Sequence, residues 1–588
     1  MQRFERTVSC GLINEQWVNK SIFLIGWVNN RRDFGSLIFV DLRDRTGIVQ
    51  LIFNPDFNKK AHELARSLRP EFVIQVHGRV VERDAKLINS ELPTGQWEVQ
   101  VDELVIINTA KTLPFSIDES ESVSEELRLT YRYLDLRNLV HLNRFILRNK
   151  ITFATREFFY EHGFLDVATP VLTKNAPEGA REFIVPSRIN KGSFYALPQS
   201  PQLYKQLLMC AGFERYFQLA PCFRDEDLRA DRQPEFTQLD IEMSFVNEID
   251  VQTIIEQYLA HLWKKIFDIS LLLPFDRMTY DEAFAQYGSD KPDLRFELPI
   301  TDCSSLFHDT KIKFLRTILG ADGKIGAIHV PEYVCSRSEL DAWEERATQL
   351  GAKGLLWIRF RDGQPNSRIA KFLPNDFMQR CKVLFPMIDA NSVIFIIAGS
   401  YAESWQLLGR LRLALAQKLN LIKENLFKFC WITDFPLFEY DEVNKRFESV
   451  HHPFTSPKEG WQELPPEKIK ARAYDIVLNG IELGGGSIRI FNEKVQAEVF
   501  KLLGLSKEEA QQRFGFLLKA MGYGFPPHGG IAIGFDRLAM IMAGASSIRE
   551  VIAFPKTHRG VDLMMNAPSP VSNEQLAEYG LEWRKDMK

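Results

Sequence analysis

Short stretches of alternating hydrophobic and polar positions dominate the first hundred residues of the chain. Five such stretches are rich in β-branched and aromatic residues and are separated by Gly, Asn and Asp: 21–28, 36–44, 47–53, 72–81 and 97–107. This pattern is typical of strands. A helical pattern near residues 59–68 lies between the third and the fourth stretch. Residues 1–108 are therefore predicted to form a small closed barrel of five strands.

The alternation also predicts which side chains face outward from this barrel. Ile38, Val40 and Leu42 share one face of the second strand, which we assign to the barrel core, so Phe39 points outward. In the third strand, Gln50 lies opposite the core face. An outward aromatic ring beside an outward amide suits the recognition of single-stranded RNA, as on an oligonucleotide-binding (OB) fold. The alternative is an exposed aromatic residue on an ordinary barrel.

The rest of the chain has the mixed pattern of α+β domains. A helical pattern from about 122 to 162 ends at Gly163. The next segment, 164–172, is predicted as a strand with Pro170 at its edge. Residues 285–420 have an alternating pattern of their own, and the segments before and after them resemble each other in sequence pattern. We therefore predict a domain inserted into a larger one.

Composition excludes several classes of protein. The chain has 588 residues and a formal net charge of −4, so it carries no general basic coat for nucleic acid. Its seven cysteines are scattered and form no C-x-x-C pair, which predicts neither a zinc site nor a disulfide framework and fits a reducing cytoplasm. No apolar run of about eighteen residues and no apolar signal core are present. We expect a cytoplasmic protein without a membrane partner.

The stretch CFRDEDLRADRQPEFTQLD, residues 222–240, is the first that suggests chemistry. Its two ends are strand-like and its centre is charged and turn-prone, which predicts a long hairpin. Arg224 ends the first strand, where its guanidinium could grip a phosphate or carboxylate at two points. Phe236 opens the return strand and could stack on a base, and Asp240 lies on the same strand face. The alternative is an exposed hairpin with salt bridges.

The second such stretch is YDIVLNGIELGGGSIRI, residues 474–490. A run of glycines inside a strand suggests a ligand that lies against bare backbone. Asp475 and Glu482 flank the run as oxygen ligands suited to Mg²⁺, and Arg489 adds a cation. Glycine triplets are common in loops, so this stretch is weak evidence by itself. The chain contains no G-x-x-x-x-G-K-[ST] motif, so a nucleotide would not be bound through a Walker loop.

The third stretch is HGGIAIGFDRLAMIMAG, residues 528–544, a glycine-rich strand that runs into an apolar helix. Asp536 is predicted to cap the helix. Arg537 falls in the first turn, where a cation opposes the helix dipole unless it has an anionic partner. This mismatch favours a functional role, and the alternative is a structural pair with some acidic side chain.

Three pieces of the chain resemble the signature motifs of class II aminoacyl-tRNA synthetases: a long helix followed by the strand GFLDVATPVL, the strand–loop–strand FRDEDLRADRQPEF, and GFDRL. Longer phrases, among them TYRYLDLR, YALPQSPQLYKQLLM, HHPFTSPK, GGGSIRI and VIAFPK, are similar to the bacterial-type aspartyl-tRNA synthetases over nearly the whole chain. The middle insertion, with GAKGLLWIRF, resembles the GAD-like domain shared with the bacterial amidotransferase machinery. The resemblance implies an OB-fold barrel at 1–108, a linker at 109–121, an antiparallel-sheet catalytic domain at 122–284 and 421–560, an inserted α/β domain at 285–420 and a C-terminal extension at 561–588.

This resemblance also implies a reaction. L-aspartate is activated with ATP to aspartyl-adenylate and then transferred to the 3′ end of tRNA(Asp), without a covalent enzyme intermediate. For ATP the family pattern names Arg224, Asp225, Glu226, Gln233, Phe236, Glu482, Gly534, Phe535, Asp536 and Arg537, with Arg224 and Arg537 as catalytic cations. For aspartate it names Glu178, Ser200, Gln202, Lys205, Arg224, Asp240, His451 and Arg489. Asp475 and Glu482 are expected to hold Mg²⁺.

Two of these cations are expected to set specificity. An asparagine amide would leave Lys205 and Arg489 buried without a counter-charge, whereas the aspartate carboxylate supplies one. The choice between His451 and His452 as the substrate contact stays open.

The resemblance extends to the partners of the barrel. Phe39, Gln50 and Glu98 are assigned to the anticodon, and Phe34 and Lys86 to discrimination between tRNA(Asp) and tRNA(Asn). Phe34 departs from the residue expected in either type, so the charging of tRNA(Asn) stays open. The family pattern also implies a homodimer.

Two alternatives compete with this interpretation. One is a sister synthetase for asparagine or lysine on the same fold, which the pairing of Lys205 with Arg489, the insertion and the tail motif AFPK disfavour. The other is a non-enzymatic RNA-binding paralogue, which should have lost an arginine or a magnesium carboxylate.

Overall fold

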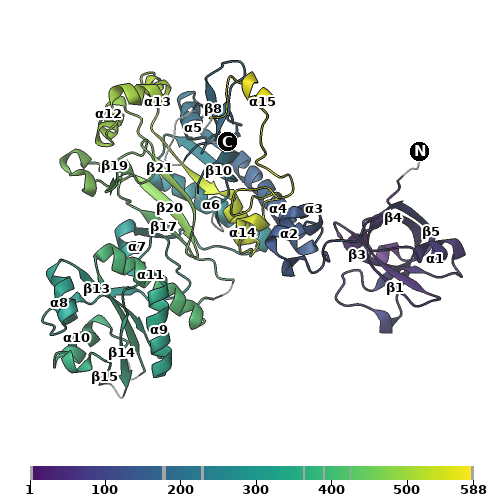
Figure 1. The fold of residues 1–588 in the computed structure, drawn as a ribbon, viewed down its shortest axis with the longest axis horizontal. Coiled ribbons are helices and arrows are strands. Elements are labelled where there is room, and N and C mark those ends of the chain that lie inside the picture. The colour runs from purple at the N-terminus through teal and green to yellow at the C-terminus, as the bar shows by residue number, and fades with distance from the viewer. Residues whose placement is uncertain are drawn as a thin grey trace. The chain divides into compact units, whose positions relative to one another are not determined.

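The structure is a computed structural model (Figure 1) that describes residues 4–174, 181–226, 231–361, 364–388, 391–423 and 425–584. The chain divides into two compact units, Met1–Arg148 with Arg549–Ser569, and Asn149–Ile548 with Pro570–Lys588. Among the described residues, no helix combines the length and the apolar character that a membrane crossing requires.

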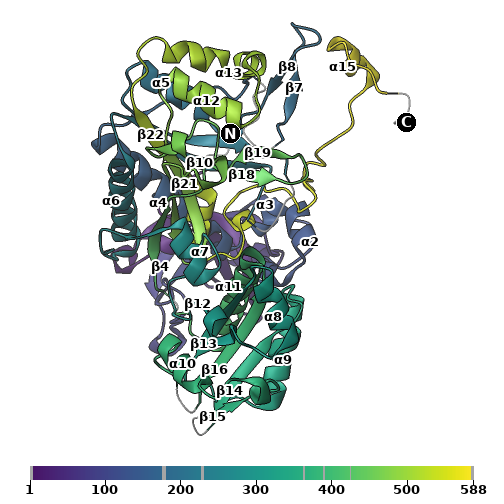
Figure 2. The ribbon, with the colours of Figure 1, turned by 90° about the vertical axis from the view of Figure 1, so that its left-hand side faces the viewer.

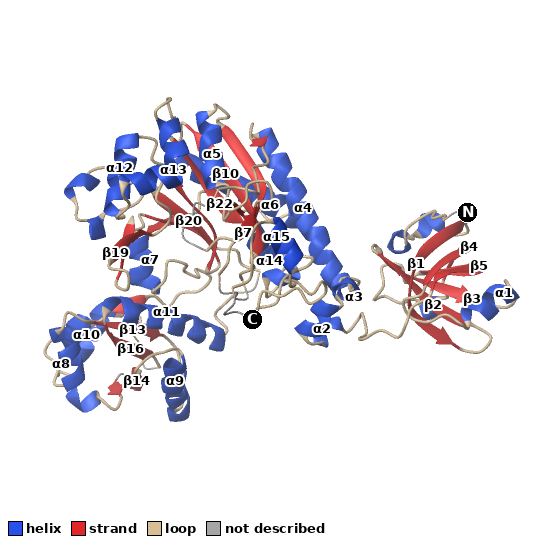
Figure 3. Ribbon diagram, turned by 45° about the horizontal axis from the view of Figure 1, so that its top comes forward, coloured by secondary structure: helices blue, strands red, loops and turns tan. Residues whose placement is uncertain are grey.

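The first unit contains the predicted barrel (Figure 3). Its strands are β1 (Ser21–Asp33), β2 (Ile38–Asp44), β3 (Gly47–Phe53), β4 (Val73–Glu82) and β5 (Trp97–Asn108), closed in the order β1-β2-β3-β5-β4. Helix α1 (Lys59–Ala65) lies between β3 and β4 in the chain. Ile38, Val40 and Leu42 are fully buried in the barrel core. The five strands, the helix and the core face of β2 are confirmed.

The helical region after the linker is not one helix but three. They are α2 (Glu125–Thr130), α3 (Arg132–Asp135) and α4 (Leu139–Glu161), and Gly163 follows α4 with a φ of 76°. The strand predicted over 164–172 is wrong in length, because β6 covers only Leu165–Asp166. Beyond it the backbone N–H of Thr169 donates to the side chain of Gln218 at 3.3 Å, and Pro170 has no N–H to donate to a neighbouring strand.

An eight-stranded sheet is the centre of the second unit. Its order is β11 (Asp276–Thr279), β17 (Phe429–Thr433), β20 (Ala473–Leu478), β21 (Ile481–Ile488), β22 (His528–Gly534), β10 (Glu235–Ser244), β9 (Arg215–Phe223) and β6. Only the two outermost pairs, β11 with β17 and β6 with β9, are parallel. Strands β9 and β10 form the predicted hairpin, with Phe223 opposite Glu235. The antiparallel catalytic sheet is therefore confirmed.

The second unit also contains helices and two small hairpins. The helices are α5 (Gln202–Cys210), α6 (Glu248–Phe267), α7 (Tyr280–Tyr287), α12 (Glu493–Leu502), α13 (Lys507–Met521), α14 (Phe535–Met542) and α15 (Asn573–Glu578). The hairpins are β7 (Ile184–Pro186) with β8 (Phe194–Ala196), and β18 (Phe438–Asp441) with β19 (Arg446–Ser449).

The inserted α/β domain has a sheet of its own (Figure 2). Its strand order is β12 (Ile300–Asp302), β13 (Lys324–Val330), β16 (Val393–Gly399), β14 (Leu356–Arg361) and β15 (Gln364–Asn366). Its helices are α8 (Lys313–Gly320), α9 (Arg337–Gln349), α10 (Phe377–Leu384) and α11 (Tyr401–Lys418). Val393, Phe395 and Ile397 pack with α9 and α11, whereas Ile394 and Ile396 pack with α8 and α10. Both faces of the sheet are therefore covered by helices, as in an α/β domain.

Candidate active site

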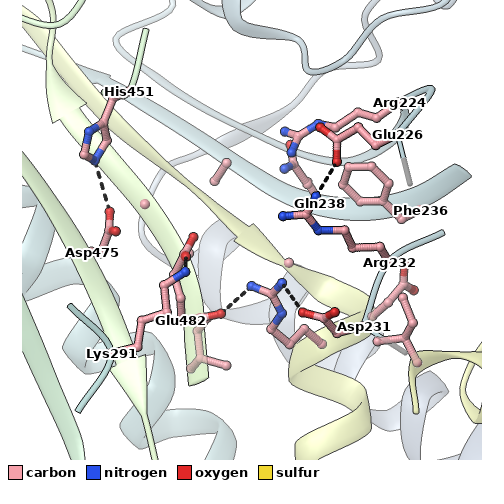
Figure 4. A pocket seen from close by; sticks show the side chains of 18 of the residues that line it. Arg224, Glu226, Asp231, Arg232, Phe236, Gln238, Lys291, His451, Asp475 and Glu482 are labelled. Atoms are coloured by element: carbon pink, nitrogen blue, oxygen red, sulfur yellow. Dashed lines mark hydrogen bonds and ion pairs between the residues drawn. The ribbon is translucent and has the colours of Figure 1, made fainter. Parts of the chain in front are cut away.

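Two adjoining cavities of about 560 and 270 Å³ open along the central strands β10, β21 and β22 (Figure 4). They share lining residues, including Arg224, Gln238 and Gly485, so they form one continuous site. The strands bring distant segments into register: Gln238 pairs with Gly534, and Gly485 pairs with Ala532. The three predicted stretches therefore meet at one place in the second unit.

The glycine run of β21 has a packing role as well as a functional one. A Cβ atom on Gly484 would lie 2.3 Å from the carbonyl oxygen of Ala532, and one on Gly486 would lie 2.2 Å from that of Gly530. Close packing against β22 thus requires these two glycines. A Cβ atom on Gly485 would instead lie 2.5 Å from Oδ1 of Asp475. Of the three glycines in this run, Gly485 is the one whose missing side chain leaves a carboxylate uncovered.

The larger cavity presents a base-sized aromatic ring beside a guanidinium group. Arg224 directly follows β9, and its Cζ lies 5.2 Å from the centre of the Phe236 ring. The Nε of Arg224 is buried and has no hydrogen-bond partner within the described part of the chain. Glu226 lines the same wall and accepts a hydrogen bond from Arg232 at 3.0 Å. Arg224 therefore has a donor that a bound anion could use.

At the other end of this cavity, Arg537 occupies the first turn of α14, as predicted. It donates to the carbonyl oxygen of Glu482 at 2.5 Å and lies 3.4 Å from the carboxylate of Asp231. The helix cap was predicted wrongly. Gly534 is the N-cap residue, while Asp536 accepts from the backbone N–H of Thr237 at 2.7 Å and so ties the helix to β10.

The larger cavity is also lined by the carboxylates of Asp290, Asp475 and Glu482. His451 Nε2 lies 3.3 Å from Oδ1 of Asp475, and the ammonium group of Lys291 lies 2.7 Å from Oε2 of Glu482. Burial raises the pKa of Asp475. For Glu482 the attraction of Lys291 and Arg537 outweighs burial and lowers the pKa.

The carboxylates meet the requirements of Mg²⁺ only in part. Among the described residues no group of three or more His, Cys, Asp or Glu side chains could hold a metal ion. One or two carboxylates plus substrate phosphates are, however, the usual ligands of Mg²⁺. Asp475 and Glu482 fit a metal that is completed by the substrate.

The smaller cavity ends on a buried cluster of four charged side chains. Lys205 Nζ lies 2.5 Å from Asp240 and 3.2 Å from Glu242, and Arg489 donates to both oxygens of Glu242 at 2.9 and 3.1 Å. Burial raises the pKa of Asp240. At Glu242 burial acts in the same direction, but Arg489 and Lys205 outweigh it and lower the pKa to about 2.

Asp240 lines neither cavity and pairs with Lys205, so its contact with the substrate stays a prediction. The expectation about counter-charges in this cluster needs correction. The charges of Lys205 and Arg489 are already balanced by Asp240 and Glu242, so a substrate with an amide would not leave them without counter-charges. The net charge of the cluster therefore does not explain a preference for aspartate over asparagine.

Both histidines of the HHPFTSP segment line the site, and they have different partners. His451 faces Asp475, whereas His452 Nε2 lies 2.6 Å from Nη1 of Arg489. Burial and the adjacent guanidinium hold the pKa of His452 well below its usual range, so this ring is neutral at pH 7. A neutral ring can accept the Arg489 N–H and fix the guanidinium plane.

The remaining predicted residues fall into three groups. Ser200, Gln202, Gln233 and Gly534 line the cavities, and the Nε2 of Gln202 is buried without a partner within the described ranges. Phe535 and Asp225 line neither cavity: Phe535 is buried in the helix, and Asp225 is exposed and pairs through its backbone with Arg181. Glu178 lies outside the described residues.

On the barrel, Gln50 and Glu98 are in contact and Phe39 lies on the strand next to Gln50, but Gln50 is buried by neighbouring side chains rather than open to solvent as predicted. Gln50 Nε2 donates to Glu98 at 2.8 Å, and Arg32 donates to Gln50 Oε1 at 3.0 Å. The half-buried Phe39 ring meets the exposed Phe34 ring edge-on, with 5.9 Å between their centres. Lys86 is exposed in the short 3-10 helix Ala85–Leu87.

Family models match both parts of the chain. A model of "tRNA synthetases class II (D, K and N)" matches residues 124–558, and one of "OB-fold nucleic acid binding domain" matches residues 22–107. The chain is 50% identical to "Aspartate--tRNA ligase" of Staphylococcus carnosus over 99% of its own length and 100% of the relative's. It is 49% identical to "Aspartate--tRNA(Asp/Asn) ligase" of Geobacillus sp. over 100% and 99%. The chain belongs to the aspartate–tRNA ligase family of class II tRNA synthetases.

Solved structures agree with this family at the level of the fold. The asparaginyl-tRNA synthetase from Pyrococcus horikoshii, complexed with asparaginyl-adenylate, matches with a TM-score of 0.60 at 20% identity, over 94% of this chain and 99% of that one. A putative aspartyl-tRNA synthetase from Leishmania major gives a TM-score of 0.60 at 19% identity, over 94% of each chain.

Three residues of the site in this aspartate–tRNA ligase family member were not predicted: Glu242 of the buried cluster and the lining residues Gln238 and Lys291. Glu242 could have been found, because it follows Asp240 by two positions and shares its strand face. Gln238 lies on that face too, and it lines both cavities. Lys291 was missed because residues from 285 onward were assigned to the inserted domain. No local pattern in the sequence marks it.

Proposed function

We propose that this chain activates L-aspartate with ATP and transfers the aspartyl group to tRNA(Asp). The observation that supports this most strongly is the convergence of Arg224, Arg537, Lys205 and Arg489 on one continuous site. They come from four distant segments of the chain. A polyphosphate and an acidic amino acid bound together would need this distribution of positive charge.

Arg224 and Phe236 serve the adenylate in this proposal. The ring of Phe236 offers a stacking face for adenine. Arg224 lines both cavities, and its Nε has no hydrogen-bond partner within the described part of the chain. A guanidinium there can bind the α-phosphate and the reacting carboxylate at once and stabilise the charge that develops as the carboxylate attacks phosphorus. Arg537, at the far end, binds the γ-phosphate, which leaves together with the β-phosphate as pyrophosphate. This arrangement positions the reactants without a protein nucleophile.

Mg²⁺ is proposed as the metal that accompanies ATP. Asp475 and Glu482 would hold it together with phosphate oxygens, and it would supply Lewis-acid stabilisation of the polyphosphate. The carboxylate of Asp475 is kept in place by His451, and Gly485 leaves it uncovered.

Selection of aspartate over asparagine follows from hydrogen-bond donors rather than from net charge. Lys205 and Arg489 carry only donors, so an aspartate carboxylate satisfies them. The NH₂ group of asparagine would point its own donors at these two groups and find no acceptor. A buried donor left unsatisfied costs about 1–3 kcal/mol, and a site built for hydrogen bonds can discriminate strongly in this way.

ATP–pyrophosphate exchange tests the proposal directly. The wild-type protein should exchange pyrophosphate when aspartate is present and not when asparagine or lysine replaces it. Exchange with asparagine or lysine alone would assign the chain to a sister specificity. Absence of exchange with all three, at normal folding, would favour a non-enzymatic RNA-binding role.

The nucleic acid partner is proposed from the barrel. Phe39, Gln50 and Glu98 form a patch that combines a ring with amide and carboxylate acceptors, which suits unstacked anticodon bases. The relatives named above include an aspartate–tRNA ligase and an aspartate–tRNA(Asp/Asn) ligase. Aspartylation of purified tRNA(Asp) and tRNA(Asn) would distinguish the two types. A homodimer and a cytoplasmic location are also proposed, from the family resemblance and the scattered cysteines.

A further inference from the structure

Lys291 is a cation that lines the larger cavity. It belongs neither to the β9–β10 hairpin nor to the glycine-rich strands β21 and β22. It lies in the loop that follows α7, and its ammonium group pairs with Glu482 at 2.7 Å. Its side chain is 41% exposed, and attraction to Glu482 outweighs the effect of burial and raises its pKa. Figure 4 shows Lys291 and Glu482 in contact on the wall that also carries Asp475. Arg537 binds the backbone of the same Glu482, so two cations meet at one residue.

The loop that carries Lys291 packs on one side against the hairpin formed by β20 and β21. Gly480 makes the turn between β20 and β21, with a φ of 83°, and a Cβ atom there would lie 3.1 Å from Cβ of Asp293. Strands β20 and β21 bear Asp475 and Glu482. The loop therefore rests directly on the turn that joins the two carboxylate-bearing strands.

On its other side the loop is fixed by the inserted domain. Arg412 of α11 is buried and donates to the backbone carbonyl oxygens of Asp293, Phe296, Glu297 and Leu298 at 2.9–3.2 Å. Its guanidinium carbon lies 4.7 Å from the ring centre of Tyr287 and 4.0 Å from that of Phe296. Within the described ranges no carboxylate lies within ion-pair distance of it. A buried guanidinium that binds only backbone oxygens and rings serves to hold a loop.

Close helix packing brings α11 to this position. A Cβ atom on Gly409 would lie 2.6 Å from the carbonyl oxygen of Tyr287, and one on Gly288 would lie 2.0 Å from that of Trp405. Trp405 Nε1 also donates to the carbonyl oxygen of Ala285 at 2.9 Å. The last helix of the insertion is thus locked onto the base of the Lys291 loop.

We infer that Lys291 is a further polyphosphate-binding residue and that Arg412 of the inserted domain positions it. Before the nucleotide binds, Lys291 neutralises Glu482. When the polyphosphate enters, its oxygens take over the ammonium group on the side opposite Arg537. The inserted domain thereby contributes to the nucleotide site. This inference rests on the proposed function, since it adds a residue for the same nucleotide.

Pyrophosphate binding measured by calorimetry in metal-free buffer with EDTA tests Lys291 independently of turnover. Lys291→Met should weaken binding about tenfold or more, because a charge-assisted hydrogen bond is lost. The matched control Lys470→Met, which removes a lysine paired with Asp281 outside the cavities, should change binding less than twofold. Equal or tighter binding by Lys291→Met, or no binding by the wild type, would overturn the inference. Aspartate-dependent exchange by the wild type separately reports whether the proposed function holds.

Arg412 is tested by its selective effect on ATP. Arg412→Lys keeps the positive charge but loses the planar guanidinium group with its several N–H donors. The KM for ATP in the exchange reaction should therefore rise several-fold, while the KM for aspartate should stay within twofold of the wild-type value. Arg410→Lys, two positions away on the same helix, is the control. The double variant Lys291→Met/Arg412→Lys should be no worse than Lys291→Met alone. Equal increases in both KM values, or fully additive losses, would contradict a positioning role.

Discussion

Lys205 and Asp240 form a buried ion pair, with Nζ 2.5 Å from Oδ1, at the closed end of the site. Both side chains are almost completely removed from solvent, and Glu242 lies 3.2 Å from the same ammonium group. Removing one member of a buried pair leaves an uncompensated charge and typically costs about 3–5 kcal/mol.

Lys205→Met should therefore lower the melting temperature clearly, and adding Asp240→Asn should restore part of the loss. Lys264→Met, at an exposed pair with Asp268, is the control and should change the melting temperature little. Thermal unfolding followed by circular dichroism measures all four proteins. If the double variant were less stable than Lys205→Met, the ion pair would not be the source of the effect.

Arg489→Lys is expected to damage aspartate binding selectively. The guanidinium bridges Glu242, His452 and Ser487, and a lysine cannot make these contacts and also bind a carboxylate. Loss of about two charge-assisted hydrogen bonds corresponds to roughly a 100-fold rise in the KM for aspartate. The KM for ATP should change little, because Arg489 lines only the smaller cavity. Exchange kinetics at varied aspartate and varied ATP measure both, and equal changes in the two constants would count against the assignment.

Much of this architecture could be predicted from local patterns, because strand alternation and glycine-rich turns act over a few residues. The barrel, the hairpin around Arg224 and the position of Arg537 are such cases. Interactions between distant segments could not be predicted. The cap of α14 was misassigned because Asp536 binds Thr237, about 300 residues away. The pairing of Asp240 with Lys205 was not predicted because Lys205 is on another element.

The pH dependence of stability should show the lowered pKa of the buried His528. Burial lowers its pKa from 6.5 to about 4, while its ring faces the carbonyl oxygen of Pro526 and the side-chain amide of Gln206. Between these two pH values the unfolded chain binds a proton that the folded protein does not, so stability rises with pH. The loss from this residue should be about 2 kcal/mol by pH 5.

Melting temperatures between pH 7.5 and 5 measure this loss. His528→Asn should be less stable at pH 7.5 and should lose less stability on acidification than the wild type. Parallel curves for the two proteins would show that His528 does not titrate in this window.

Phe39→Ala should affect the tRNA-dependent step alone. Base–aromatic stacking contributes about 1–3 kcal/mol per base, so the KM for tRNA(Asp) in aminoacylation should rise about tenfold. Aspartate-dependent exchange without tRNA should be unchanged, because the barrel and the two cavities belong to different units. Phe57→Ala, an exposed phenylalanine after β3, is the control. A loss of exchange activity, or an equal effect of Phe57→Ala, would argue against an anticodon role for Phe39.

A crystal structure of the protein with a non-hydrolysable aspartyl-adenylate analogue is the most direct test of the whole site. We expect adenine on the ring of Phe236, the phosphate mimic on Arg224, and the aspartyl carboxylate on Lys205 and Arg489. An analogue bound elsewhere, or bound here with Lys205 and Arg489 turned away from its carboxylate, would contradict the assignment.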